Sequence, residues 1–371
     1  MKVLVLLTFL CLYDTQASPT DINLLSSWLK QQQYTNQSIP QSLGAVKVHY
    51  SPATNDQKGT GYFRVSPYLS NLGMIGLLQA NNTFMDTVKL WIVWYFSHLN
   101  QKSAPSGVPF EHFYDVNGNQ ETICVQPGSS TFCNYNDATD SAAATFLYLL
   151  KSAYTFGLPK SVLVQYKGNI EKLGNLLLSL QQPDGLLWAK TDYRVKYLED
   201  NCEVFAGLKS LSYIEQYVFQ NVTQAGVYNK AADRIQSAIL RELYNNTLKR
   251  YRVAKFESGT FYDANPDIWY PDLQAQFWPH LWEVVAYNDV KTQNVLKLMT
   301  NRWNDWTKNP TYATGWIESG VAHAIWLTGD KNHTMLYLQA VKRLKFPLFP
   351  WPFTVTDAGW LIQTFSQQTM V

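Results

Sequence analysis

The chain has 371 residues, a net charge of +2 and only 16% charged residues. This balance gives no bulk electric field that would attract nucleic acid or a membrane surface. Aromatic residues make up 15% of the chain, with 13 Trp and 23 Tyr. Because their rings combine an apolar body with a polar tip, they suit either a large core or a surface that stacks on sugar rings.

The N-terminal sequence MKVLVLLTFLCLYDTQAS predicts a secretory signal peptide over residues 1–18. Lys2 precedes an apolar run that is too short to span a bilayer, and small residues follow. Residues 19–371 are then expected to form one secreted domain, with no membrane association after cleavage. Five N-x-S/T sequons support a secreted glycoprotein. Their asparagines are Asn36, Asn81, Asn221, Asn245 and Asn332.

Three cysteines remain after the signal peptide. Cys124 and Cys133 lie in one loop-like segment, so a short-range disulfide is expected in an oxidising compartment. Cys202 lies in a segment that predicts a buried helix, and we expect its thiol to remain free.

Two kinds of predicted helix alternate along the chain. Six segments are apolar on nearly every face, which is typical of buried helices, and they begin near residues 67, 137, 200, 271, 314 and 354. Six others have a single apolar stripe, and they cover residues 20–33, 82–100, 160–181, 226–245, 290–307 and 332–345. The connectors 34–66 and 101–136 are predicted as loops. Short β pieces are expected only near 182–199 and near 246–262. The first of these two segments is predicted as a hairpin-like loop.

This alternation predicts an all-α fold, an (α/α)6 toroid with six inner and six outer helices. The helix at 20–33 would close the circle beside the last inner helix; the alternative is an open solenoid of helical hairpins. Because the turns from buried to amphipathic helices are short, all inner helices should run in the same direction. Their N-termini and the long loops would then share one mouth, where function is expected.

Four inner segments resemble the six-hairpin glycosidase superfamily: TDSAAATFLYLLKSAY, EDNCEVFAGLKSLSYIE, WYPDLQAQFWPHLWEV and GWIESGVAHAIWLTGD. The resemblance covers essentially the whole mature chain. It implies one of several carbohydrate activities, because the superfamily contains glycoside hydrolases, unsaturated glucuronyl hydrolases, polysaccharide lyases and sugar epimerases. In the unsaturated glucuronyl hydrolases, aspartates at the mouth ends of inner helices act as acid and base. Asp140 and Asp200 are the positions most similar to those aspartates.

Cleavage of a glycosidic bond generally needs two carboxyl groups. We predict Asp140 and Asp200 as the catalytic pair, with Asp272 as a third candidate. The competing interpretation is structural, because an acid in the first turn can cap a helix, and Asp200 and Glu203 have the spacing of a capping box. The recurrence of acids at three inner-helix starts weakens this structural interpretation.

Aromatic residues in or beside the mouth loops are predicted to stack on an oligosaccharide or polysaccharide. They are Trp188, Tyr197, Trp269, Tyr270, Trp316 and Trp351. Five cations in the same loops could hold a carboxylated sugar or could be solvated loop charges. They are Arg64, Lys190, Arg194, Lys196 and Arg252.

No cofactor is expected, and the absence of HExxH and Cys-x-x-Cys motifs argues against a metal site. Three alternatives to a hydrolase stay open. A polysaccharide lyase would use a Tyr or His base beside a cation that neutralises a uronate. A sugar epimerase could use His280 or His323, although both are expected first as hydrogen-bonded core residues. A non-catalytic carbohydrate-binding protein would keep the aromatic residues without activity.

Overall fold

The computed structural model describes residues 19–55, 61–100, 107–119, 121–122, 124–125, 132–133, 136, 139–311 and 315–368. The predicted signal peptide lies outside these residues. Within the described part of the chain, no helix is long and apolar enough to cross a membrane.

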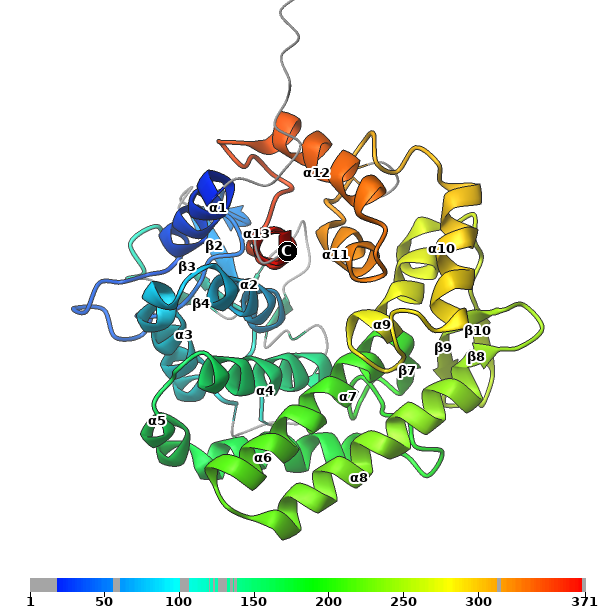
Figure 1. Cartoon of the computed structure of the whole chain (residues 1–371). Coiled ribbons are helices and arrows are strands. Elements are labelled where there is room, and N and C mark those ends of the chain that lie inside the picture. Colours follow the sequence, from blue (N-terminus) through cyan, green and yellow to red (C-terminus); the bar gives the residue numbers. More distant parts are fainter. Residues whose placement is uncertain are drawn as a thin grey trace, which may run out of the picture.

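The helices form two concentric rings (Figure 1). The inner ring contains α2 (Pro67–Ala80), α4 (Thr139–Thr155), α7 (Leu198–Tyr213), α9 (Trp278–Leu281), α11 (Ser319–Leu327) and α13 (Val355–Gln368). The outer ring contains α1 (Pro19–Gln31), α3 (Met85–Ser97), α5 (Lys160–Gln165), α6 (Lys167–Leu180), α8 (Val222–Ala238), α10 (Val290–Arg302) and α12 (Lys331–Lys345). Short π-helical segments, Ile214–Val218 and Ile239–Leu243, extend α7 and α8. The (α/α)6 toroid is therefore confirmed.

The ring closes where α13 packs against α2, which the open solenoid does not allow. Gly76 and Gly359 face each other across this seam, and a β-carbon built on Gly76 would lie 2.1 Å from the carbonyl oxygen of Gly359. Ser366 Oγ also donates a hydrogen bond of 3.1 Å to the backbone oxygen of Gln79, which lies 287 residues earlier in the sequence. The two helices therefore touch backbone to backbone, and only glycine leaves room for that approach.

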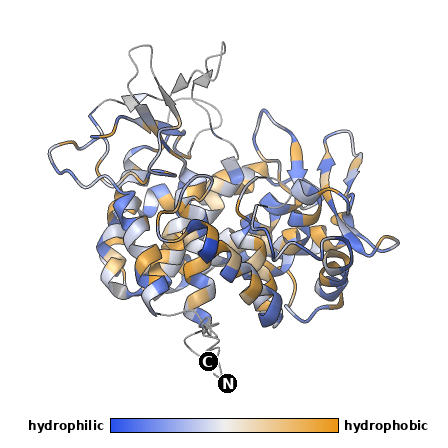
Figure 2. Cartoon of the chain, turned by 90° about the horizontal axis from the view of Figure 1, so that it is seen from above, coloured by the Kyte–Doolittle hydropathy of each residue, from blue (hydrophilic) through white to orange (hydrophobic). Residues whose placement is uncertain are grey.

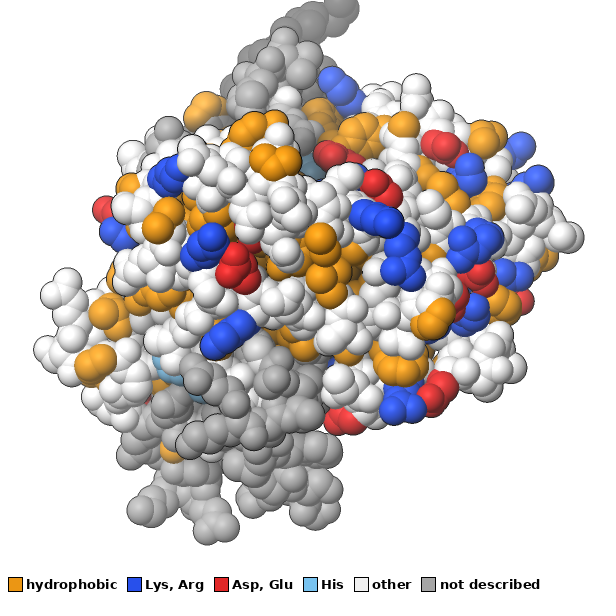
Figure 3. Space-filling view, turned by 90° about the horizontal axis from the view of Figure 1, so that it is seen from below, with side chains coloured by type: hydrophobic (Ala, Val, Ile, Leu, Met, Phe, Trp, Pro, Cys, Tyr) orange, Lys and Arg blue, Asp and Glu red, His pale blue; other side chains and the backbone are white. Residues whose placement is uncertain are grey.

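The outer helices carry the polar surface that the sequence predicts. Figure 3 shows a side of the molecule on which basic and acidic side chains are interspersed rather than separated by sign. Asp233 on the outer helix α8, for example, pairs at 2.6 Å with Lys209, which reaches the surface from the inner helix α7. This surface agrees with the small net charge of the chain.

The fourth inner helix corrects the prediction of one buried helix beginning at 271. The chain instead forms a π-helical turn (Trp269–Leu273), a 3₁₀ turn (Gln274–Phe277) and the four-residue α9. Pro271 and Pro279 lie inside this stretch, and a proline removes a backbone donor and crowds the preceding turn of a helix. The segment still occupies the fourth position of the inner ring, but its backbone hydrogen bonds do not follow one regular α-helical pattern.

The long connectors gather on one side of the helical rings and contain the strands (Figure 2). Four strands from the two connectors predicted as loops form an antiparallel sheet, which corrects that prediction: β1 (Thr54–Asn55), β2 (Gly61–Val65), β3 (His112–Tyr114) and β4 (Glu121–Thr122). A second sheet contains β7 (Val195–Tyr197), β8 (Tyr244–Asn245), β9 (Arg250–Phe256) and β10 (Phe261–Asp263). Residues 182–199 are hairpin-like at their start, where Gln181 and Leu187 form an antiparallel bridge across a tight turn, whereas β7 at their end pairs with the distant strand β9.

The backbone brings the two loop cysteines opposite each other. Strands β5 (Cys124–Val125) and β6 (Phe132–Cys133) are antiparallel, with Cys124 and Cys133 as direct partners. Directly opposed Cα atoms in such a pair are about 4.5–5.5 Å apart, within the range a disulfide needs. Their side chains lie outside the described part of the structure, so the bond stays a prediction. Cys202 is buried and free, as expected.

We expect non-reducing peptide mapping of the secreted chain to recover one peptide pair joined through Cys124 and Cys133. The short loop limits the effect on the free energy of unfolding to about 2–3 kcal/mol. Cys202 serves as the internal control, because it should be alkylated only after unfolding. Recovery of Cys124 and Cys133 as free thiols would contradict the assignment.

Two buried histidines connect neighbouring inner helices. One ring nitrogen of His280 on α9 lies 3.2 Å from the backbone oxygen of Ala324, and Nδ1 of His323 on α11 lies 3.0 Å from Thr364 Oγ1 on α13. Burial lowers the pKa of His280 to about 4 and that of His323 to about 3. Both imidazoles are therefore neutral, hydrogen-bonded core groups, in agreement with the first expectation from the sequence.

Stability should consequently depend on pH through His323. In the unfolded chain this imidazole titrates near pH 6.5, so as pH falls below that value the unfolded state takes up a proton that the folded state refuses. Its contribution to the free energy of unfolding should fall by roughly 1.4 kcal/mol per pH unit between about pH 6 and pH 4. Buried carboxyl groups with raised pKa values act in the opposite sense, so the wild-type curve alone does not isolate the effect.

The measurement is urea unfolding of the wild-type chain and of His323→Gln at pH 7, 6, 5 and 4.5. The glutamine amide can still donate to Thr364 but does not titrate. As pH falls, we expect the free energy of unfolding of the wild-type chain to decrease relative to that of His323→Gln. A difference that stays constant over this range would show that His323 is not held neutral.

Candidate active site

Asp140 is the second residue of α4, at the mouth end of the inner ring. Its side chain is 0% exposed. One carboxyl oxygen, Oδ1, accepts a hydrogen bond of 2.8 Å from the backbone N–H of Ser141, and the buried Oδ2 has no partner among the described residues. An uncompensated buried carboxyl oxygen is costly in a purely structural group, so it needs a further explanation.

A second inner helix brings acids to the same place. Glu199 and Asp200 are the second and third residues of α7, and both side chains are partly buried. Burial raises the pKa of Asp140 well above its usual range, and the nearby Asp200 and Glu203 carboxylates raise it further, although the hydrogen bond from Ser141 opposes this. Burial and the neighbouring acids Asp200 and Glu203 likewise raise the pKa of Glu199. The two predicted catalytic aspartates therefore lie close enough to influence each other's charge.

Glu203 is the functional candidate that sequence reasoning missed. The capping-box interpretation is wrong. Helix α7 begins at Leu198, so Asp200 already lies inside the helix and Glu203 lies a full turn from its start. Its Oε1 instead accepts hydrogen bonds from Tyr68 Oη on α2 at 2.7 Å and from Trp278 Nε1 on α9 at 3.0 Å. Burial raises the pKa of Glu203 to about 7, even though these hydrogen bonds lower it. The sequence gives no separate signal for this role, because the spacing from Asp200 to Glu203 is also that of a capping box.

Asp272 lies in the π-helical turn of the fourth inner segment and is fully buried. Its Oδ2 accepts a hydrogen bond of 2.7 Å from Tyr262 Oη, and its Oδ1 accepts one of 2.7 Å from the backbone N–H of Asn265. Both carboxyl oxygens are therefore engaged in holding the loop after β10. This arrangement suits an anchor for the mouth better than a proton donor.

Two further acids lie at the starts of the last inner helices. Glu318 precedes the first residue of α11, and its backbone N–H donates to Tyr337 Oη at 2.7 Å. Asp357 lies in the first turn of α13, where its Oδ2 accepts hydrogen bonds from the backbone N–H and the hydroxyl of Thr354. Burial raises the pKa of Asp357 to about 7 against the effect of these bonds. The mouth is therefore lined by acids from several inner helices.

Three of the six predicted stacking residues present accessible rings. Tyr270 is 56% exposed, Trp316 49% and Trp351 53%. Trp316 and Trp351 lie in the connectors before α11 and α13. Their rings pack edge to face, with 5.1 Å between the ring centroids. Edge-to-face rings form a stable aromatic surface.

The other three stacking candidates are less available. Trp269 is only 4% exposed and packs edge-on against Trp303, which corrects its assignment to the mouth surface. The Arg194 guanidinium lies over the partly buried Trp188 ring at 4.8 Å. The Tyr197 hydroxyl forms a hydrogen bond of 2.8 Å with that of Tyr193.

Within the described residues, no group of three or more His, Cys, Asp or Glu side chains is arranged to hold a metal ion.

The sequon asparagines Asn36, Asn81 and Asn332 are exposed. Asn221 instead caps α8 by accepting from Gln224, and Asn245 donates to Asp263 at 3.3 Å. Glycosylation stays a prediction, and the exposed three are its better candidates.

No protein-family model matches the sequence, and a comparison with curated protein sequences finds no match. Solved structures do match along almost the whole chain. An α-amylase from Clostridium perfringens aligns with a TM-score of 0.61 and 12% identity over 94% of this chain and 98% of that one. A GH76 α-mannanase from Bacteroides thetaiotaomicron aligns with a TM-score of 0.55 and 12% identity over 95% and 97%. The chain has the six-hairpin glycosidase-like fold.

A third six-hairpin structure, a glycosidase variant in complex with glucose, aligns with a TM-score of 0.60 and 10% identity over 95% of this chain and 98% of that one. At such identities the likeness concerns the fold alone. In this six-hairpin toroid, the side chains that could carry out chemistry concentrate around Asp140 and its acidic neighbours on α7.

Proposed function

We propose that the chain is a secreted glycoside hydrolase in which Asp140 is the general acid and Asp200 is the partner carboxylate. The observation that carries this proposal is the Asp140 carboxyl group itself. It is fully buried at the mouth end of α4, one of its oxygens has no described partner, and two acids on α7 lie close to it.

These surroundings support the acid role. A helix N-terminus stabilises an anion and would by itself lower the pKa of a carboxyl group. Burial and the like charges of Asp200 and Glu203 oppose that effect and favour the protonated form. A carboxyl group held protonated near neutral pH can give its proton to the leaving oxygen of a glycosidic bond.

Asp200 suits the second role because it is less buried than Asp140 and lies on the neighbouring inner helix. Inner helices pack about 8–10 Å apart, so carboxyl groups on two of them can reach opposite sides of one bond. Asp200 would either activate water or attack the sugar directly. Glu203 holds Tyr68 and Trp278 in place and supplies part of the negative charge that keeps Asp140 protonated.

Trp316 and Trp351 are proposed to bind the glycan at the rim of the mouth. Replacing Trp351 by alanine should raise KM about 5- to 10-fold with little change in kcat, because a lost aromatic contact is worth about 0.5–1.5 kcal/mol. Tyr217→Ala is the matched control, since that ring is 54% exposed but lies at the opposite end of α7. Equal KM values for both variants would exclude the rim from glycan binding.

The function is tested by incubating the purified chain with a panel of oligosaccharides and polysaccharides and measuring new reducing ends. Hydrolysis of at least one member supports the proposal. Products that absorb in the near ultraviolet would instead indicate a lyase. Binding without any product would indicate a carbohydrate-binding protein.

A further inference from the structure

A cavity of about 340 Å³ lies at the end of the inner ring that is opposite the mouth. It is lined by the C-terminal halves of α4 and α7 and by the end of α9. Its residues on α4, Tyr148 and Lys151, come eight and eleven positions after Asp140, which places them about 12–17 Å further along the helix. The cavity is therefore separate from the candidate active site.

The broken fourth inner segment explains why there is space at this end. Helix α9 ends at Leu281 after four residues, whereas α4 and α7 have 17 and 16 residues. Glu283 then has a φ of 61°, a left-handed conformation that is uncommon for a residue other than glycine. The early end of α9 leaves space beside the C-terminal halves of α4 and α7.

The cavity has aromatic walls. Trp282 packs edge to face against Tyr148, with 5.3 Å between the ring centroids, and Phe205 and Tyr213 on α7 add two further rings to the lining. Aromatic walls with a few polar groups are typical of small-molecule sites, whose volumes range from about 300 to 1,000 Å³. A volume near the lower limit suits one small ring rather than a long polymer.

Three polar groups of the lining have no hydrogen-bond partner among the described residues. They are the hydroxyl groups of Tyr148 and Ser210 and the Nε1–H group of Trp282, a residue that is only 4% exposed. Burial and the nearby Glu283 carboxylate raise the pKa of Tyr148 to about 12, so its hydroxyl group keeps its proton. A ligand that carries several hydroxyl groups could supply the missing partners.

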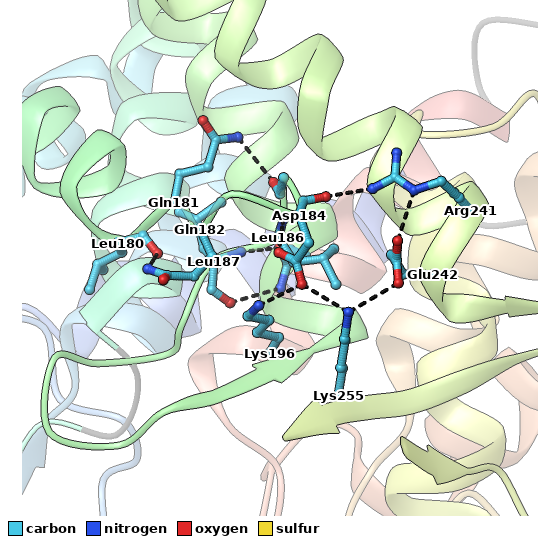
Figure 4. Close-up of polar contacts among 12 residues, drawn as sticks. Leu180, Gln181, Gln182, Asp184, Leu186, Leu187, Lys196, Arg241, Glu242 and Lys255 are labelled. Atoms are coloured by element: carbon cyan, nitrogen blue, oxygen red, sulfur yellow. Dashed lines mark hydrogen bonds and ion pairs between the residues drawn. The ribbon is translucent and has the colours of Figure 1, made fainter. Parts of the chain in front are cut away.

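Lysines that brace this fold are paired with carboxylates. Figure 4 shows Lys196 and Lys255, both of which contact Asp184 Oδ2, at 2.6 and 3.0 Å. In the cavity wall, Lys209 is paired in the same way with Asp233 at 2.6 Å. The charge of these three ammonium groups is therefore neutralised within the protein.

Lys151 has no carboxylate partner among the described residues. Its ammonium group lies 5.7 Å from the centroid of the Tyr213 ring. The same lining contains Glu283, which has the opposite charge and accepts a hydrogen bond from the Tyr287 hydroxyl. A cationic ligand would be repelled by Lys151 and an anionic one by Glu283, so the lining favours an uncharged ligand.

We propose that this cavity is a second sugar-binding site, which holds one neutral sugar unit. The aromatic walls would pack against the C–H groups of the sugar ring, and Tyr148, Ser210 and Lys151 would form hydrogen bonds with its hydroxyl groups. The site does not depend on the proposed hydrolysis, because none of the acids at the mouth lines it.

The test measures the binding of single sugars to the purified chain by ligand-observed NMR titration at pH 7. The neutral probes are glucose, mannose and galactose, and the charged probes are glucuronate and glucosamine. We expect at least one neutral hexose to bind at least about threefold more tightly than both charged probes, the scale of charge interactions at a partly exposed site. Failure of all neutral hexoses to bind, or equal or tighter binding of a charged probe, would overturn the proposal.

Conservative variants locate the bound sugar. Tyr148→Phe keeps the ring and removes the hydroxyl group, and Lys151→Met keeps an apolar stem and removes the ammonium group. Each should raise Kd for the neutral hexose about 3- to 10-fold, the effect of one lost hydrogen bond. Tyr154→Phe is the matched control, because this tyrosine is also on α4 but does not line the cavity. Binding that responds to Trp351→Ala but not to Tyr148→Phe or Lys151→Met would place the sugar at the mouth and overturn the proposal.

This proposal and the hydrolase proposal fail separately. A chain that hydrolyses glycans, but whose hexose binding ignores both cavity variants, keeps the hydrolase proposal and loses the second site. A chain that cleaves no glycan, but binds a neutral hexose through Tyr148 and Lys151, keeps the second site and loses the hydrolase proposal. Melting curves of the variants check that a change in Kd does not reflect unfolding.

Discussion

Replacing Asp140 by asparagine is expected to lower turnover of a cleaved glycan at least about 100-fold while changing the melting temperature little. The amide has the shape of the carboxyl group and keeps an oxygen for the hydrogen bond from Ser141, but it has no proton to transfer. The buried Oδ2 lacks a described partner, so the substitution removes no second hydrogen bond from the fold.

Asp272→Asn is the matched control, because it makes the same chemical change in another buried acid of the inner ring. Both carboxyl oxygens of Asp272 accept hydrogen bonds, from Tyr262 Oη and from the backbone N–H of Asn265. In the variant, the NH₂ group of the asparagine replaces one of these oxygens and therefore faces a hydrogen-bond donor. We expect a loss of about 1–3 kcal/mol in the free energy of unfolding and a much smaller loss of turnover. The measurements are initial rates and thermal melts of both variants. If Asp140→Asn keeps its turnover and loses stability instead, Asp140 is structural.

Gly76→Ala is expected to lower the free energy of unfolding by at least about 3 kcal/mol, or to prevent folding. The new methyl group would lie 2.1 Å from the carbonyl oxygen and 2.3 Å from the Cα of Gly359. Both contacts are with backbone atoms, which cannot rotate away as a side chain can. The two helices would have to separate, and the seam of the ring would open.

Gly226→Ala on the outer helix α8 is the control, because a β-carbon there meets nothing within 4 Å. Alanine is the better helix former, so this variant should gain about 0.5–1 kcal/mol. Urea unfolding and secreted yield measure both effects. Equal unfolding midpoints for the two variants would show that the seam tolerates separation.

The sequence was sufficient for the ring because polarity differs between its two layers. Segments such as the one containing Phe146 and Leu150 are apolar on all faces and fill the inner ring, and each alternates with an amphipathic partner. The sheet of β1–β4 could not be predicted in the same way. Its strands are two to five residues long and pair across connectors, and local periodicity carries no information on such distant partners.

The candidate site was predicted in part for a similar reason. Asp140 and Asp200 could be brought together because inner helices that run in parallel place their starts at one mouth. Glu203 was hidden, since its spacing from Asp200 is that of a cap, and only tertiary contacts with Tyr68 and Trp278 reveal its position. Trp269 was misplaced because its position between a loop and a broken helix does not show which way its ring turns.

The closure between α2 and α13 also orders events during synthesis. The Gln79–Ser366 contact joins residues 287 positions apart, and at about 5–20 residues per second the ribosome needs roughly 15–60 s to cover that interval. Hairpins such as α7 with α8 can pack soon after they emerge, because their contacts are local. The inner face of α2 must wait for its last partner throughout that period, so the nascent chain carries an uncovered apolar helix. Chaperone supply and translation speed should therefore affect the yield of this protein more than the stability of the finished ring does.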